Sequence, residues 1–129
     1  MLEQGLKYTA TTTVTEDKTA KAMGSGTLDV FATPAMIALM EKAAYKAVAD
    51  YLDEGCGSVG TYLNIKHLAA TPLGMTVRCE AELVEIDNRR LVFSVKAYDE
   101  VGLIGEGSHE RFIVQNEKFM AKTNQKSAK

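Results

Sequence analysis

Three polar side chains of this sequence have the types and the spacing to act together on a substrate: Thr33, Glu41 and His67. A carboxylate can serve as general base or nucleophile, an imidazole can transfer a proton near neutral pH, and a hydroxyl can orient either group. Eight residues separate Thr33 from Glu41. On a helix this is about two turns, or about 12 Å along the axis, on roughly the same side. These residues form the candidate catalytic set.

Glu41 is the most informative of the three, because it lies where a helix should be apolar. Residues 33–52 have helical periodicity, and their other charged side chains cluster on a different side of the helix. The neighbours of Glu41 one turn away are Ile37, Ala38, Ala44 and Tyr45. Because an unpaired carboxylate is costly to bury, a carboxylate on an apolar face is often functional. The alternative is that Glu41 reaches the rim of the protein or pairs with a partner subunit.

His67 lies in a segment with the alternation of a β-strand, residues 62–68, on the same face as Leu63 and Ile65. If that face covers the helix, the imidazole and the carboxylate of Glu41 point into the same layer. A carboxylate beside an imidazole supports acid/base chemistry. Taken alone, a single histidine on an apolar face is more often structural.

Thr33 also has an ordinary explanation. It precedes Pro34, and a threonine before a helical proline is expected to be the N-cap, a role worth about 1 kcal/mol. Further along, residues 55–60 are rich in glycine and are expected to form a turn. The backbone N–H groups of that turn could stabilise an oxyanion, and a simple tight turn is the alternative.

The elements that must position these side chains follow from periodicity. Residues 6–14 predict a strand, residues 16–28 a mobile loop, and residues 33–52 a helix. Beyond the helix the period changes to two, which predicts strands over 59–68, 75–86, 91–99 and 105–115. Short connectors at 87–90 and 100–102 favour an antiparallel meander. The prediction is an α+β domain in which a curved antiparallel sheet wraps a long central helix.

Length and composition limit the function classes. With 129 residues, 46% hydrophobic and 25% charged, the chain fits a single domain, 1–129, with 118–129 as a partly flexible tail. The net charge of −2 gives no field for holding nucleic acid. The sequence has no signal-peptide pattern, no apolar run that could cross a membrane and no metal-ligand spacing around its two cysteines. These features predict a cytoplasmic protein without metal.

Five blocks of sequence carry a family resemblance. They are Val-Phe-Ala-Thr at 30–33, Leu-Met-Glu at 39–41, Gly-Ser-Val-Gly-Thr at 57–61, His-Leu-Ala-Ala-Thr-Pro at 67–72 and Gly-Ser-His-Glu-Arg at 107–111. In this order and spacing they resemble the hot-dog-fold thioesterases of the fluoroacetyl-coenzyme A thioesterase type. The resemblance implies a catalytic set of Thr33, Glu41 and His67, with Gly60 and Arg111 positioning the acyl group. It also implies a homodimer with the site at the subunit interface, and leaves further pairing into a tetramer open.

The implied reaction is hydrolysis of a small acyl-coenzyme A (acyl-CoA) thioester to a carboxylic acid and free CoA, with CoA as part of the substrate and no cofactor. Glu41 would be general base or nucleophile, a choice that the sequence leaves open. One alternative is a hot-dog hydratase acting on enoyl thioesters, whose Asp-x-Asn-Pro-x-His pattern this chain lacks. The other is a non-catalytic module that binds acyl thioesters.

The sequence departs from the family just before the helix. Fluoroacetyl-CoA thioesterase carries aromatic residues there that cover its acyl pocket, whereas residues 24–28 of this chain read Gly-Ser-Gly-Thr-Leu. Without aromatic bulk, selectivity for a fluorinated acyl group is not expected, and several short acyl groups should be accepted.

Overall fold

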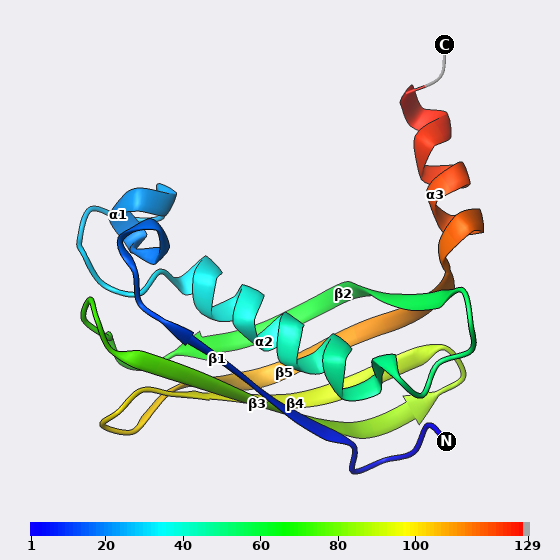
Figure 1. The fold of residues 1–129 in the computed structure, drawn as a ribbon, viewed down its shortest axis with the longest axis horizontal. Helices are drawn as coiled ribbons and strands as arrows, with labels where there is room; N and C mark the ends of the chain where they lie inside the picture. The colour runs from blue at the N-terminus through cyan, green and yellow to red at the C-terminus, as the bar shows by residue number, and fades with distance from the viewer. Residues whose placement is uncertain (128–129) are drawn as a thin grey trace.

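The computed structural model describes residues 1–127, which form a curved five-stranded antiparallel sheet with one long helix across its concave face (Figure 1). The strands are β1 (Lys7–Thr13), β2 (Cys56–His67), β3 (Thr76–Asp87), β4 (Arg90–Tyr98) and β5 (Leu103–Gln115). The helices are η1 (Glu16–Lys18), α1 (Ala20–Met23), α2 (Thr33–Ala49), α3 (Asn116–Asn124) and η2 (Gln125–Ser127). This is the predicted α+β arrangement of a long helix wrapped by a sheet.

The strand order is β1-β3-β4-β5-β2, so only part of the predicted meander is present. Strands β3, β4 and β5 follow one another as expected, and the β3–β4 turn contains Asn88 with a φ of 58°. Strand β2, however, lies at the far edge and pairs with β5. The connector from β2 to β3 crosses the end of the sheet, where Val30 bridges to Pro72 and the N–H of Leu68 donates to the Ile104 carbonyl. The prediction of a simple meander was wrong at this connection.

The core lies between α2 and the inner face of the sheet. Alternate residues of β3 and β4 are buried there, as the period of two predicts. The buried helix residues are Met36, Leu39, Met40, Ala43, Ala44, Ala47 and Val48. Because three of them are alanines, the middle and end of α2 can approach the sheet closely. This packing fixes which side of the helix faces β2 and β5.

Three segments differ from their predictions. Residues 16–28 contain η1 and α1, and α1 is capped by Thr19, whose hydroxyl accepts a hydrogen bond from the Ala22 N–H. Residues 56–60 belong to β2, so the predicted glycine-rich turn is confined to the residues before Cys56, where Gly55 has a φ of 83°. Helix α3 occupies most of the predicted tail and rises away from the sheet on the side of α2 (Figure 1). Residues 128–129 of that tail lie outside the described residues.

Candidate active site

The hydroxyl of Thr33 lies 2.7 Å from Nδ1 of His67, at the point where the start of α2 meets the end of β2. Thr33 is the first residue of α2, and the N-cap is Ala32, whose carbonyl accepts from the Met36 N–H. The prediction that Thr33 caps the helix was therefore wrong. Because the extended backbone of Ala32 starts the helix, the threonine hydroxyl is left free to pair with the imidazole.

The imidazole of His67 is half-buried, and one of its nitrogens has no partner among residues 1–127. Burial lowers its pKa, while the nearby backbone of Ala69 acts in the opposite direction. The neutral form is therefore favoured near neutral pH. Nε2 is buried and makes no hydrogen bond within residues 1–127. A buried polar atom of this kind calls for a partner, and residues 1–127 of a single chain do not supply one.

A cavity of about 280 Å³ opens beside this pair. It is lined by Ala20, Ser25, Val30, Phe31, Thr33, His67, Leu68, Ala69 and Ala70. The lining residues are mostly small, and their exposed surface is polar and apolar in similar measure, with the hydroxyl of Thr33 and the ring of His67 as the polar groups on the side of α2 and β2. Such a cavity suits a short acyl chain whose carbonyl meets a few fixed polar groups.

Glu41 lies two turns further along α2 and has a partner in its own chain. Its Oε2 atom is 3.8 Å from Nη1 of Arg111, and 37% of its side chain is exposed. Gly60 of β2 makes room for it, because a Cβ at that position would lie 2.8 Å from the same oxygen. The carboxylate on the apolar side of the helix is thus stabilised by the guanidinium of Arg111 on β5. It fits there because Gly60 on β2 has no side chain.

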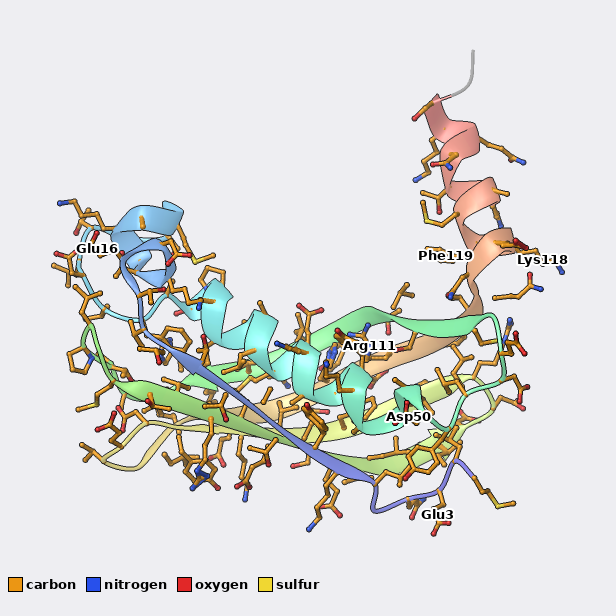
Figure 2. All side chains as sticks on the ribbon, in the orientation of Figure 1. Glu3, Glu16, Asp50, Arg111, Lys118 and Phe119 are labelled. Carbon is orange, nitrogen blue, oxygen red and sulfur yellow. The ribbon has the colours of Figure 1, made fainter. Side chains whose placement is uncertain are left out.

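Arg111 is buried next to α2 (Figure 2). Its guanidinium is held at three points. Nε donates to Ser58 Oγ at 2.8 Å, Nη2 donates to the Ser58 carbonyl at 2.8 Å, and Nη1 lies 3.1 Å from Nε2 of His109. Burial lowers the pKa of Arg111, and the charge of Glu41 acts in the opposite direction. An arginine nevertheless remains a cation, so it provides a fixed positive charge beside Glu41.

Within one chain the predicted site residues therefore form two groups. Thr33 and His67 meet at the cavity, and Glu41 meets Gly60 and Arg111 about 12 Å further along the helix axis. No hydrogen bond or ion pair joins Glu41 to His67 within residues 1–127.

Two residues of the Glu41 group, Ser58 and His109, were not recognised as site residues from the sequence. The signal for His109 was its position two residues before Arg111 in a strand pattern, which puts both side chains on one face. Ser58 lies in the glycine-rich block and gives no comparable signal, because its contact with Arg111 depends on how β2 pairs with β5.

The described residues offer no metal site. Within 1–127 no three His, Cys, Asp or Glu side chains are grouped to hold a metal ion. In the same stretch, every helix is too short or too polar to cross a membrane.

The helix-on-sheet fold and the position of the cavity define the class of protein. The structure matches a thioesterase superfamily member of Thermus thermophilus with a TM-score of 0.90 and 32% identity, over 98% of this chain and 94% of that one. A hot-dog-like protein of Thermanaerovibrio acidaminovorans, 23% identical, has the same fold with a TM-score of 0.87. That match covers 97% of this chain and 93% of the Thermanaerovibrio acidaminovorans protein. The fold is thus the hot-dog fold, as predicted.

The family is narrower than this class. Residues 14–117 match the family model described as fluoroacetyl-CoA-specific thioesterase, and the chain belongs to that family. It is 50% identical to the fluoroacetyl-CoA thioesterase of Streptantibioticus cattleyicolor over 99 residues, 77% of this chain and 71% of that protein. The structure of the fluoroacetyl-CoA thioesterase FlK matches with a TM-score of 0.92 and 41% identity, over 98% of both chains. These matches confirm the resemblance and the thioester hydrolase class, and they favour it over the hydratase and the non-catalytic module.

Proposed function

We propose that this protein hydrolyses small acyl-CoA thioesters to the carboxylic acid and free CoA. The observation that carries the proposal is the Thr33–His67 hydrogen bond at a small cavity, with Nε2 of His67 buried and unpaired within the described residues. Structures of the related FlK contain fluoroacetate, acetyl-CoA, or fluoroacetate with CoA. A cavity of about 280 Å³ has room for an acyl group of that size.

The proposed mechanism has two routes. In the first, Glu41 takes a proton from a water that attacks the thioester carbonyl carbon. In the second, the Glu41 carboxylate attacks that carbon itself and forms an anhydride that water then hydrolyses. In both routes the C–S bond breaks, and the sulfur leaves as a thiolate that takes up a proton. In this mechanism the hydroxyl of Thr33 donates to Nδ1 of His67, so the neutral imidazole carries its hydrogen on Nε2, which must become accessible to the substrate. His67 then stabilises the leaving thiolate by donating a hydrogen bond from Nε2, and the thiolate takes up the proton released when water adds to the acyl group.

The distance between the two groups supports a homodimer as the catalytic unit. Strand β2 is an edge strand of 12 residues, and it exposes Tyr62 (48%) and Leu63 (42%). A long open edge of this kind is usually paired or covered. Antiparallel pairing of two β2 edges about a point between Gly60 and His67 would bring the partner's Glu41 toward the Thr33–His67 pair. The dimer is thus proposed as the unit in which all three groups meet, and pairing into a tetramer stays open.

The first test is Glu41→Gln, with release of free thiol from a panel of short acyl-CoA substrates as the measurement. The amide keeps the shape of the side chain but is neither base nor nucleophile, so kcat should fall by a factor of about 100 or more. The matched control is Glu106→Gln, which makes the same change at an exposed glutamate of β5. If Glu41→Gln turns over within about threefold of the parent, well below the usual acid/base contribution, Glu41 is neither base nor nucleophile.

The dimer is tested separately by light scattering and activity of Leu63→Arg, which places a charge on the β2 edge. We expect a monomer that folds but has lost most of its turnover. An active monomer of either the parent or this variant at micromolar concentration would contradict the shared site.

A further inference from the structure

His109 lies completely buried on β5 between the sheet and α2, and both of its ring nitrogens have a partner. Nδ1 is 2.9 Å from the carbonyl oxygen of Tyr62 on β2. Nε2 is 3.1 Å from Nη1 of Arg111, which follows two residues later on the same strand. The ring also lies 6.2 Å from that of Phe93 on β4, so it is packed as well as hydrogen-bonded.

These two partners determine the protonation of the ring. A carbonyl oxygen can only accept, so Nδ1 must carry the hydrogen, and a guanidinium can only donate, so Nε2 must present its lone pair. Only the neutral Nδ1–H tautomer satisfies both contacts. Burial, together with the charge of Arg111, lowers the pKa of His109, although the Tyr62 carbonyl, Glu41 and Glu110 act in the opposite direction.

The acceptor on His109 completes the fixation of Arg111. Ser58 accepts hydrogen bonds from Nε and Nη2 of Arg111, and Nε2 of His109 accepts one from Nη1. The second N–H of Nη1 is then left for the carboxylate of Glu41, at 3.8 Å between Nη1 and Oε2. Because a guanidinium is planar, three fixed points set its orientation, and Glu41 must adapt to it.

We propose that His109 is a positioning residue of the thioesterase site. Tied to β2 through the Tyr62 carbonyl, it presents an acceptor that orients Arg111, and Arg111 in turn holds the carboxylate of Glu41 above Gly60. This inference rests on the proposed role of Glu41. His109 itself touches neither the cavity nor the Thr33–His67 pair.

The test uses two substitutions that each keep one half of the contact. In His109→Gln the side-chain carbonyl reaches the position of Nε2, so the acceptor for Arg111 is kept and the donor to Tyr62 is lost. In His109→Asn the amide nitrogen reaches the position of Nδ1, so the donor to Tyr62 is kept and the acceptor for Arg111 is lost. Both variants lose one buried hydrogen bond and some ring packing, so their thermal stabilities should fall to a similar extent.

We expect kcat of His109→Asn to fall by about 10- to 100-fold, the cost of a misplaced catalytic group, while His109→Gln stays within about fivefold of the parent. KM for the acyl-CoA should change little in either variant, because His109 does not line the cavity. Ser58→Ala, which loosens Arg111 from its other side, should also lower kcat without raising KM. A purely structural histidine would make the two His109 variants lose activity in step with their stability.

Two results would overturn the proposal. One is equal loss of kcat in His109→Asn and His109→Gln. The other is failure of both to fold, combined with parental turnover of Ser58→Ala. A wrong role for Glu41 would give a different result from a wrong role for His109. It would appear as full turnover of Glu41→Gln, whatever the His109 variants do.

Discussion

Gly60→Ala adds a single methyl group at the point where β2 faces the carboxylate of Glu41. The new Cβ would lie 2.8 Å from Glu41 Oε2, 3.2 Å from His109 Cε1 and 3.5 Å from Arg111 Nη1. Ordinary contact begins at 3.4 Å, so the carboxylate oxygen must move by about 0.6 Å. His109 is packed in the core, and Arg111 is fixed by Ser58, so Glu41 is the side chain free to give way.

The fold should tolerate this change. Gly60 has no left-handed φ, so alanine can adopt its backbone conformation. Replacing a glycine that alanine can match reduces the entropy of the unfolded chain and adds about 0.4–1 kcal/mol of stability, which offsets the local clash. Activity should respond differently, because a shift near 1 Å of a catalytic group can cost about 100-fold. We therefore expect kcat/KM to fall by about 10- to 100-fold with little change in melting temperature.

The chain provides a matched control on the same strand. In Gly57→Ala the new Cβ would meet Asn116 Oδ1 at 2.8 Å, the same distance to the flexible end of a side chain, and its three nearest atoms all belong to Asn116. Thiol release and thermal unfolding are measured for both variants. If Gly60→Ala and Gly57→Ala have equal activity, the position of Glu41 above Gly60 does not control turnover, and the reasoning fails.

Four further predictions concern the pair at the cavity, pH, the thiol and the substrates. Thr33→Val removes the hydroxyl that pairs with His67 and should lower kcat by about 10-fold or more, whereas Thr33→Ser should stay close to the parent. Because burial lowers the pKa of both His67 and His109 from 6.5, the unfolded chain binds protons that the folded chain does not. The free energy of unfolding should thus fall as the pH drops below about 6.5 and level off above it. In a variant with both His67 and His109 replaced by glutamine, the urea midpoint should fall less over the same pH range. Burial raises the pKa of Cys79 to about 12, so peptide mass spectrometry after alkylation at pH 8 should find it modified only once the protein unfolds. Residues 24–28 contain no aromatic ring, so short acyl-CoA substrates, fluorinated or not, should have kcat/KM values within about 100-fold of one another; cleavage of fluoroacetyl-CoA with acetyl-CoA ignored would refute this.

Local signals in the sequence were enough to predict the elements and their contents. The helix was expected at 33–52 and lies at Thr33–Ala49, and each predicted strand overlaps an observed one. This works because hydrophobic periodicity and turn residues act over a few neighbouring positions, and the packing of α2 on the sheet then follows from its apolar side. Glu41 could be singled out in the same way, since its surroundings on the helix are set by residues one turn away.

The tertiary structure decided what these residues touch. The partner of Thr33 is 34 residues away, and Arg111 meets Ser58 53 residues away, so neither contact has a local signal. Both depend on β2 leaving the meander to pair with β5, a choice set by the global packing of the sheet. The same pairing places Gly60 opposite Arg111 and beneath Glu41, where a missing side chain becomes space for a carboxylate. The sequence by itself therefore determined which groups are available, and the register between distant strands decided which of them meet.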